Sequence, residues 1–574
     1  MKFPEIIGSV FSPFIRFGGL TTKRGLAYRK EDETEIKFPT TKEGTTIPVL
    51  FGTRDISSPI LGWYGDVVSD HEQPGDGLDY YIGALFVLAH GHIERMTRIS
   101  YGDRLIWSGN ITDGSDTIEA NNNFEDGSCL SGKFYFDNGA NSNQINGYLS
   151  DKSGVNVKYN GLSHVILEHN YIGKAPNLKA PKFRCYGKPA PAYSFDPSGS
   201  LEKIEAPETA LGINATLLET AISGWDATWF VWVDANEKPT SEVEFSFSFF
   251  DTNPDSGTYQ VAAVTAGDDY QDRYSSENFD YYADFTTYQL SGVFVVKPGD
   301  FKYYGEKAAV IISARIANHD PSFSAPIFTA KIPAQVDANP AHILYACLTN
   351  KVWGLGYADS AIQTPDFLYA AEYLKNTESF GLSLLWSESS SIEEIVNEVL
   401  RTINGVIYQS RETGRFRLSL IRKDYSEPEL LVLDSSNIME VSSYTRGSFD
   451  DLYNAVNLSY YSTQLGGAAG VSVSDLAATQ EQGITRSVDI DFPALSNDRT
   501  AKLVAARELK RSVTLQEAVT ISAKYDAQYL NIGDAFIVNY PKYWADPVVM
   551  RVAKVDFGNG RSNTITIDAV KEWI

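Results

Sequence analysis

Cysteine and methionine are scarce in this chain, which has 3 Cys and 4 Met among 574 residues. The cysteines, Cys129, Cys185 and Cys347, are odd in number and far apart in the sequence. This spacing indicates neither a disulfide framework nor a thiolate metal site. The scarcity of cysteine therefore favours folding in a reducing compartment.

Long apolar runs are also missing. The longest comparable block, Ala84 to Ala89, has the size of a strand, whereas a membrane helix needs about 20 apolar residues. The N-terminal stretch Met1 to Ile7 contains Pro4 and Glu5 and is followed by no small-residue cleavage pattern. The sequence thus predicts neither a transmembrane helix nor a signal peptide.

Positively charged residues are fewer than negatively charged ones. The chain has 49 Lys and Arg against 73 Asp and Glu, a net charge of −24. Tight binding to a phosphate backbone depends on Lys and Arg, which displace the counterions of the nucleic acid. Nucleic-acid binding is therefore not expected as the main function. An acidic surface could still line a passage through which DNA slides without adhering.

The composition is that of a large globular protein. A length of 574 residues predicts roughly three to five domains. Apolar residues make up 43% and charged residues 21%, so the chain is not expected to be disordered. Aromatic residues, at 13%, favour strands. The predicted fold class is multidomain and mainly β, with a smaller α+β part.

Turn-forming clusters and changes in pattern predict five regions. The clearest strand is Val243 to Phe249, where apolar residues alternate with Glu and Ser. The expected regions are an N-terminal segment at 1–40, a first β domain at 41–194 with a loop-rich excursion at about 110–160, an inserted β-sandwich at 195–335, an α+β domain with helices and a hairpin at 336–429, and a second β domain at 430–574. Further strands are expected at 134–136, 228–233, 292–296 and 308–314, with a closing pair of strands around Asn559-Gly560.

A short helix with a defined start is predicted after Asn339. The Asn339 side chain can cap the helix, and Pro340 occupies a position where a missing N–H costs nothing. Four apolar residues then recur on one face: Ile343, Leu344, Cys347 and Leu348. The stretch from Trp353 to Gly356 is expected to end the element with two positions that tolerate left-handed backbone and one large apolar anchor.

Three more helices are predicted. One starts at Thr364-Pro365 with Thr364 as the cap and reaches about Lys375. Another begins with a capping box, Ser391 to Glu394, carries an apolar stripe and stops at Gly405. It leads into a hairpin whose turn contains Gly414. The last helix is expected at about 499–512.

Motifs for chemistry are weak. Residues 127–133 have the spacing of a phosphate-binding loop, but Phe134 replaces the metal-binding hydroxyl and a strand is expected to follow, so coincidence is the preferred explanation. His90, His92 and Glu94 could place three metal ligands on one face of a strand. A turn that contains two histidines is the simpler interpretation.

No pair of carboxylates stands out for glycoside hydrolysis, because the required separation is spatial. The many Tyr and Trp residues could stack on sugars, although core packing is their commoner role. The sequence contains no Gly-x-Ser-x-Gly elbow and no His-Glu-x-x-His helix. Neither an enzyme activity nor a cofactor is predicted.

Three segments, in order, resemble the central hub proteins of long-tailed bacteriophages, the group of lambda-type tail-tip attachment proteins and related phage tail proteins. They are Ile47 to Arg54 with Trp63 to Asp66, Gly91 to Ile93 and Gly102-Asp103; Asn339 to Tyr357; and Ser391 to Leu420. The second segment is similar to the pattern Asn-Pro-Ala-x-Ile-x-Tyr-x-x-Leu-Thr-x-x-x-x-Gly-x-Gly. The residues that carry it are Asn339, Pro340, Ala341, Leu348, Thr349, Trp353, Gly354 and Gly356.

The resemblance implies a structural virion protein made in the host cytoplasm and located at the distal tip of the tail. It implies a homotrimer in which two related β domains per subunit, here about 41–190 and 430–574, match the sixfold tail tube. The implied partners are the distal tail protein ring, the tape-measure protein, other tail-tip or fibre proteins, and DNA only in transit. Residues 110–160 and 195–335 match nothing in the family, and the long fibrous C-terminal extension of the lambda-type protein is not found here.

An alternative stays open beside the hub. The sandwich at 195–335 could bind or cleave a glycan of the host surface, and both roles could be combined in one chain. Glycan-array binding or polysaccharide cleavage would favour this alternative, whereas a trimer that associates with tail proteins would favour the hub.

Overall fold

The computed structural model describes most of the chain, and every structural statement below concerns the described residues. These are 45–70, 78–102, 104–118, 128–140, 145–154, 156–174, 178–188, 193–206, 208–218, 225–234, 239, 242–250, 261–267, 281–284, 289–297, 301–304, 307–309, 311–317, 325–386, 391–449, 452–558 and 563–573. The predicted fold class is confirmed, because the chain is mainly β, with several curled sheets and few helices. None of the described helices is both long and apolar enough to cross a membrane.

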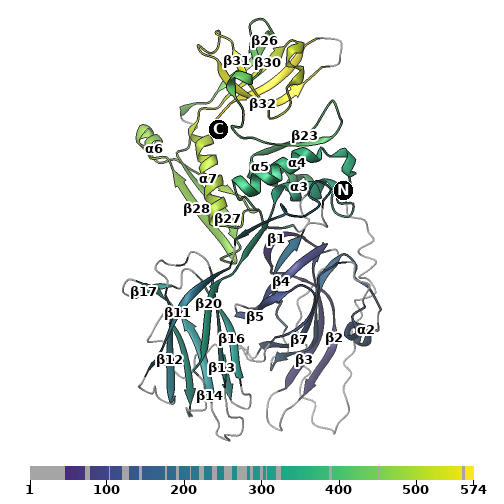
Figure 1. Ribbon diagram of the computed structural model, residues 1–574, viewed down its shortest axis with the longest axis vertical. Helices are drawn as coiled ribbons and strands as arrows, with labels where there is room; N and C mark the ends of the chain where they lie inside the picture. Colours follow the sequence, from purple (N-terminus) through teal and green to yellow (C-terminus); the bar gives the residue numbers. More distant parts are fainter. Residues whose placement is uncertain are drawn as a thin grey trace.

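Figure 1 shows how the parts are arranged. Two β modules lie side by side at the lower end, helices occupy the middle, and a further β-sheet forms the upper end. The lower modules are a first module (residues 45–188) and an inserted sandwich (209–332). The upper end is a terminal sheet formed by residues 432–446 and 517–571. The candidate site lies where these parts meet.

The first module is a curled ten-stranded sheet. Its elements are β1 (Val49–Ile56), β2 (Ile60–Asp70), β3 (Asp79–His90), β4 (His92–Tyr101), β5 (Arg104–Ile111), β6 (Gly114–Ile118), β7 (Ser128–Asp137), α2 (Gly147–Ser153), β8 (Leu162–Gly173), β9 (Lys182–Lys188) and the returning strand β22 (Leu384–Trp386). The strand expected at 134–136 belongs to the longer β7, which pairs with β8. The near-continuous apolar run of β3 is explained by burial on both faces: Phe86 enters the main core, whereas Leu85 and Val87 enter two smaller ones.

The inserted sandwich is connected to the rest by two antiparallel strands, β10 (Lys203–Ala206) and β21 (Gln335–Ala338). Its strands are β11 (Thr209–Leu218), β12 (Ala227–Asp234), β13 (Val243–Phe250), β14 (Val261–Gly267), β15 (Tyr281–Asp284), β16 (Gln289–Val296), β17 (Lys302–Tyr304), β18 (Lys307–Ala309), β19 (Ile311–Ala317) and β20 (Ile327–Ile332). The alternation in β13 is confirmed, since Phe245, Phe247 and Phe249 are buried and the serines between them are partly exposed. Within the strand expected at 308–314, the described residues 308–309 belong to β18 and 311–314 to β19.

The helical module contains α3 (Pro340–Thr349), α4 (Thr364–Glu372), α5 (Ile392–Ile403) and the hairpin β23 (Gly405–Gln409) and β24 (Phe416–Leu420). The helix α4 continues as a π-helical turn, η3 (Tyr373–Thr377). Gln363, not Thr364, occupies the cap position of α4, so that expected cap is wrong. In α5, the Ser391 hydroxyl accepts the Glu394 N–H as predicted, but the left-handed stop is Asn404, at φ 51°, and not Gly405.

The C-terminal part contains two separate sheets. The six-stranded terminal sheet consists of β25 (Val432–Asp434), β26 (Ile438–Arg446), β30 (Glu517–Ala523), β31 (Ala535–Asn539), β32 (Val548–Asp556) and β33 (Ile565–Lys571). A three-stranded sheet consists of β27 (Ala455–Ser462), β28 (Gly467–Ser474) and β29 (Ser487–Asp491), with α6 (Leu476–Gln482) and α7 (Asp498–Val513) beside it. The helix expected at 499–512 is confirmed by α7. The turn expected at Asn559-Gly560 lies outside the described residues. Three short 3₁₀ turns complete the set, at Asp359–Ala361, Glu427–Glu429 and Tyr525–Tyr529.

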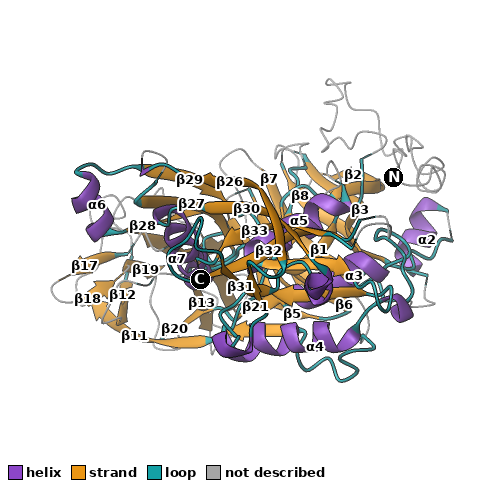
Figure 2. Ribbon diagram, turned by 90° about the horizontal axis from the view of Figure 1, so that it is seen from above, coloured by secondary structure: helices purple, strands orange, loops and turns teal. Residues whose placement is uncertain are grey.

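Two separate cores hold the C-terminal part in place. The three-stranded sheet and α7 share one core with the helical module, whereas the terminal sheet has a core of its own. In Figure 1, α3, α4 and α5 lie between the lower modules and the terminal sheet, and Figure 2 shows α3 and α5 close to β1. The helical module is therefore the connecting body of the molecule.

Candidate functional site: a buried junction between modules

Asn339 connects three segments at the start of α3. Its side-chain oxygen accepts the Ala341 N–H at 3.1 Å, which confirms the predicted cap. Its side-chain amide donates to the carbonyl oxygens of Leu201 and Ala371, both at 2.9 Å. Asn339 is fully buried, so these bonds are shielded from water. This single residue therefore holds the chain before the insertion, the start of α3 and the end of α4 together.

The helix α3 is buried on all sides and not along one face only. Every residue from Pro340 to Leu348 is buried, including Ala341. Pro340 occupies the first turn as expected, and the Thr349 hydroxyl donates to the Tyr345 carbonyl oxygen at 2.8 Å. A helix surrounded by protein in this way fits its place at the centre of the largest core.

The end of α3 depends on a close approach at Gly354. A Cβ atom there would lie 2.7 Å from the carbonyl oxygens of both Asn350 and Cys347. Only Gly356 of the two glycines has left-handed backbone, at φ +72°. Of the two positions expected to tolerate left-handed backbone, only Gly356 adopts it, and glycine at 354 is required by space and not by backbone angle.

Trp353 is the predicted anchor and is 6% exposed. Its ring packs edge-on against Phe51 of β1, at 5.7 Å between ring centroids, and against Trp386 of β22, at 6.2 Å. Both contacts cross from the helical module to the sheet of the first module. Edge-on aromatic pairs add to the stability gained by burial.

A buried contact between a histidine and a carboxylate, which the sequence did not reveal, lies beside α3. His342 Nε2 is 3.2 Å from Asp196 Oδ2, and both side chains are at least 97% buried. Burial alone would raise the pKa of Asp196, but the Leu201 N–H, Ser198 and His342 lower it. The rings of Tyr193 and Phe195 pack against the imidazole, and the Tyr345 ring packs against Phe195. The pair links the segment before the insertion to α3.

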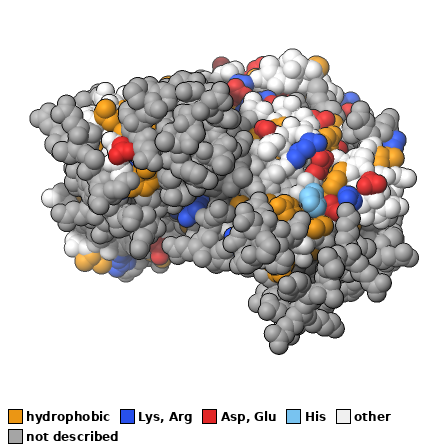
Figure 3. All heavy atoms as spheres, turned by 90° about the horizontal axis from the view of Figure 1, so that it is seen from below, with side chains coloured by type: hydrophobic (Ala, Val, Ile, Leu, Met, Phe, Trp, Pro, Cys, Tyr) orange, Lys and Arg blue, Asp and Glu red, His pale blue; other side chains and the backbone are white. Residues whose placement is uncertain are grey.

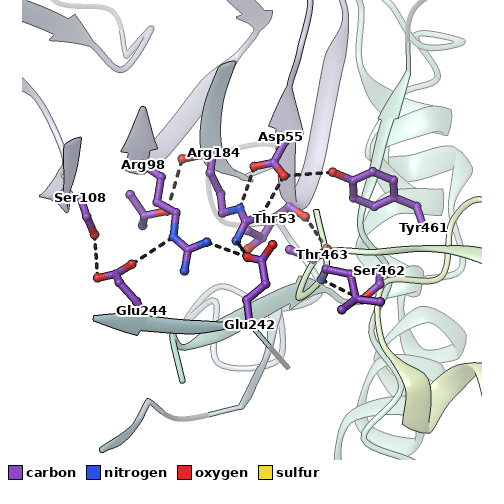
Figure 4. Close-up of polar contacts among 12 residues, drawn as sticks. Thr53, Asp55, Arg98, Ser108, Arg184, Glu242, Glu244, Tyr461, Ser462 and Thr463 are labelled. Atoms are coloured by element: carbon purple, nitrogen blue, oxygen red, sulfur yellow. Dashed lines mark hydrogen bonds and ion pairs between the residues drawn. The ribbon is translucent and has the colours of Figure 1, made fainter. Parts of the chain in front are cut away.

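Figure 4 shows a second cluster, where the first module meets the inserted sandwich. Arg98 of β4 binds two carboxylates of the sandwich, Glu242 at 2.9 Å and Glu244 at 3.1 Å. Ser108 of β5 donates to the other oxygen of Glu244 at 2.8 Å. Because Glu244 faces the first module, it is only 4% exposed although it occupies a polar position in an alternating strand.

The same chain of contacts continues to the three-stranded sheet. Arg184 of β9 reaches Glu242 at 3.2 Å and binds both oxygens of Asp55, at 2.7 and 2.8 Å. Tyr461 of β27 donates to Asp55 at 3.1 Å (Figure 4). The polar network therefore runs from the sandwich through β4, β9 and β1 to β27.

The electrostatics of this network follow from burial and pairing. Burial and the neighbouring Arg184 charge lower the pKa of Arg98, against the opposing effect of Glu244 and Glu242. Burial also acts to lower the pKa of Arg184, but Asp55 and Glu242 raise it overall. For Asp55, burial acts to raise the pKa, and Arg184 and Tyr461 bring it below its usual value. Their opposite charges offset one another. The cluster therefore holds the sandwich, the first module and the three-stranded sheet together.

Asp337 forms the centre of a third group of contacts. Ser383 donates to its carboxylate at 2.6 Å and Asn497 does so at 3.0 Å. The Ser383 hydroxyl also accepts the Thr53 N–H at 2.9 Å, and Thr463 donates to the Thr53 carbonyl oxygen at 3.0 Å. Burial raises the pKa of Asp337, although these hydrogen bonds oppose the shift. Strands β1 and β21, the segment before β22 and the start of α7 therefore share one polar centre.

A fourth cluster connects the helical module upward. Glu378 binds Arg422 at 2.8 Å and Arg507 of α7 at 2.6 Å. Burial would raise the pKa of Glu378, but the two guanidinium groups lower it. Arg551 of β32 donates to the Arg422 carbonyl oxygen at 3.1 Å. The terminal sheet is thus attached to the helical module beside this cluster.

The weaker sequence motifs do not assemble a site. Residues 128–133 belong to strand β7, which confirms the preference for coincidence over a phosphate loop. Within the described ranges, no three His, Cys, Asp or Glu side chains are grouped so that they could hold a metal ion. His90 and His92 flank the left-handed Gly91 in a turn, and Glu94 pairs with Lys203. The three cysteines are buried free thiols, as expected, and burial raises the pKa of Cys347 to about 12.

Sequence reasoning found α3 but missed the charged junction. Arg98 and Glu244 are 146 positions apart, and Asp55 and Tyr461 are 406 positions apart. The one local signal was Glu244 itself, a charged residue inside a strongly aromatic strand. Its partner could not be identified without the fold.

Comparison with known proteins gives one match to a family model. Residues 391–555, from the start of α5 into β32, match the family described as "Putative phage tail protein". No relative was found among curated proteins.

Several solved structures resemble the chain at low identity. They include a chain of the virion of a native gene transfer agent particle (10% identity, TM-score 0.47, covering 100% of this chain and 92% of that chain). Others are the 43 kDa tail protein of prophage MuSo2 from Shewanella oneidensis (11%, 0.25, 62% and 97%) and a tail protein from Neisseria meningitidis MC58 (9%, 0.26, 64% and 98%). All three TM-scores are below 0.5.

Proposed function

We propose, from the match of residues 391–555 to the family described as "Putative phage tail protein", that the chain is a structural protein of a bacteriophage tail. More specifically, we propose that it is the hub at the distal tip of the tail, where three copies close the end of the tail tube. The family match is the observation that carries this proposal. In this role the chain binds the distal tail protein ring above it and the end of the tape-measure protein.

The junction supports a role in assembly. Four polar clusters, centred on His342, Arg98, Asp337 and Glu378, each join modules that are distant in sequence. Removing one partner of a buried ion pair is strongly destabilising, so the clusters of Arg98 and Glu378 resist separation of the modules they join. The buried hydrogen bonds of Asp337 and His342 add to this, because an unpaired buried polar group is costly. A protein that joins a tube to other tail-tip components has to keep its domains in fixed relative positions, and such clusters provide this.

The eight residues that carry the family resemblance, between Asn339 and Gly356, have a structural role in this proposal. Asn339, Pro340, Ala341, Leu348 and Thr349 build or cap α3. Trp353, Gly354 and Gly356 form the stop that packs against the first module. We propose that these eight residues set the position of the helical module relative to the ring-forming β modules.

The distribution of charge supports a DNA passage. The net charge of −24 disfavours tight binding to a phosphate backbone. On the face seen from below, acidic and basic side chains of the described residues are interspersed and form no continuous basic patch (Figure 3). One face of the three-stranded sheet carries exposed polar and acidic side chains, among them Asn457, Ser459, Asp489 and Asp491. We propose that this face lines or adjoins the channel through which DNA leaves.

The proposal is tested by mixing the purified chain with distal tail protein from the same phage. We expect the chain to have the mass of a trimer and to form a stable complex with the ring of that protein. The variant Trp353→Ala is the negative control. It alters the packing between the end of α3 and the first module without changing surface charge. A strictly monomeric chain that binds no tail protein would contradict the proposed hub.

A further inference from the structure

The strand β28 is an unprotected sheet edge. It is eight residues long, Gly467–Ser474, and stands at one end of the three-stranded sheet with β27 as its only strand partner. Its pairing with β27 shows no register shift, and its sequence Gly-Ala-Ala-Gly-Val-Ser-Val-Ser contains neither a charge nor a proline. Natural proteins normally protect such edges with charges, prolines, bulges or very short strands.

Other edges of the described sheets are protected in these ways. The strand β25 has only three residues, and β26 carries Glu440, Arg446 and two register shifts. At the opposite edge of the three-stranded sheet, β29 carries Asp489 and Asp491. The strand β16 is also uncharged and eight residues long, but it packs against β5 of the first module. Compared with these described edges, β28 is long, uncharged, regular and not covered by another module.

Apolar side chains surround the end of this edge. In α6, which follows β28, none of the seven residues is buried, and Leu476 is 80% exposed. Phe449 and Tyr453, which precede β27, and Ile484, which precedes β29, are exposed at 62%, 43% and 54%. The buried Asn454 links these segments, since its side chain donates to Gln482 and to the Ile484 carbonyl oxygen. A seven-residue helix without buried residues gains little from packing in one copy alone.

Figures 1 and 2 both place α6 and β28 at the outside of the molecule. In the described part of the chain, the backbone of β28 hydrogen-bonds only to β27. Its apolar face is covered by α7 and the helical module, with Val471 buried in their shared core. The remaining edge is open to a strand from outside.

We propose that β28 and the adjoining apolar surface, which consists of Phe449, Tyr453, Leu476 and Ile484, bind a second copy of this chain. The copy adds an extended segment to the β28 edge, as in other cases of β-strand addition. The inference rests on the proposed function, because it identifies the surface by which copies join in the ring.

Charge leaves this edge as a place where a second copy can approach. Two copies of a chain with net charge −24 repel each other wherever acidic surfaces meet. The stretch 464–480 has Asp475 as its only charged residue, and that carboxylate is already used as the cap of α6. An uncharged edge bordered by exposed apolar side chains is the surface on which such copies can approach with the least repulsion.

The test introduces lysines at two exposed positions of β28, in the double variant Ala468→Lys, Ser474→Lys. Lysines on an edge strand hinder strand addition. The matched control is Ser443→Lys, Thr445→Lys, which adds the same charge at exposed positions of β26. We expect the β28 variant to raise the concentration at which copies assemble by at least about tenfold, and the control to leave it unchanged.

Cross-linking identifies the partner. A photoreactive residue is placed at position 468, and unlabelled copies are mixed with copies labelled with ¹⁵N. A mixed cross-link between labelled and unlabelled peptides supports the inference. Cross-links only to another tail protein, or unchanged assembly of the β28 variant while the wild-type chain is trimeric, would overturn it. If the wild-type chain is itself monomeric, the proposed hub fails first, so the two failures are distinguishable.

Discussion

Replacing Arg98 by Met should loosen the inserted sandwich from the first module. Arg98 is 5% exposed and holds two sandwich carboxylates, at 2.9 and 3.1 Å. Methionine fills much of the same space but leaves Glu242 and Glu244 without this cation. Removing one partner of a buried ion pair costs about 3–5 kcal/mol. Arg184 still reaches Glu242 and Lys331 still reaches Glu244, at 3.2 and 3.6 Å, so we expect the lower end of that range.

Hydrogen exchange resolved by peptide is the suitable assay, because the chain has several modules and need not unfold in one step. A loss of about 3 kcal/mol should speed exchange in β4 and β13 on the order of 100-fold. The control is Lys502→Met, which removes an exposed pair with Asp498 whose side chains are 62% and 50% exposed, and costs less than about 1 kcal/mol.

A second variant separates the ion pair from general packing damage. Adding Glu244→Gln to Arg98→Met removes one of the two carboxylates that have lost Arg98 and should restore at least about 1 kcal/mol of the loss. If exchange in β4 and β13 changes no more in Arg98→Met than in Lys502→Met, the cluster does not hold the modules together and the reasoning is wrong.

Three further changes test the rest of the junction. Trp353→Ala should lower the free energy of unfolding by about 3–5 kcal/mol through a core cavity and prevent tail assembly. The control Val352→Ala, at a side chain 65% exposed, should do neither. Full assembly and unchanged thermal stability of the Trp353 variant would contradict this prediction. Gly354→Ala should cost about 1–3 kcal/mol by overpacking, because its Cβ would lie 2.7 Å from two carbonyl oxygens; a melting temperature equal to wild type would show that the turn adapts. Burial raises the pKa of Asp337 above its unfolded value, so its ionisation removes stability as pH rises from about 4 through the folded pKa. In denaturant titrations, the free energy of unfolding of Asp337→Asn relative to wild type should therefore be higher at pH 7.5 than at pH 4.5. The opposite order would refute the raised pKa of Asp337.

Local chemistry in the sequence predicted the elements that depend on neighbouring residues. The caps at Asn339 and Ser391, the alternation of Phe245, Phe247 and Phe249, and the helix α7 all follow from short-range rules and are present. Errors occurred where two neighbouring residues could serve the same purpose. Asn404 takes the left-handed position next to Gly405, and Gln363 takes the cap position next to Thr364.

The candidate site could not be read from the sequence, because its partners are brought together only by the fold. Asp337 lies in a short strand with no distinguishing pattern, and its contacts come from Ser383 and Asn497. The burial of His342 against Asp196 likewise depends on the return of the chain after the inserted sandwich. What the sequence did provide was the family-like segment around α3, which lies at the centre of the core shared by the helical module and the three-stranded sheet.

Electron cryomicroscopy of tails that carry a tagged copy of this chain is the decisive measurement for the proposed hub. We expect three copies around the tail axis at the distal end of the tube, with the tag density repeated threefold. Tails without this chain, or copies located along the tube or away from its axis, would contradict the proposal.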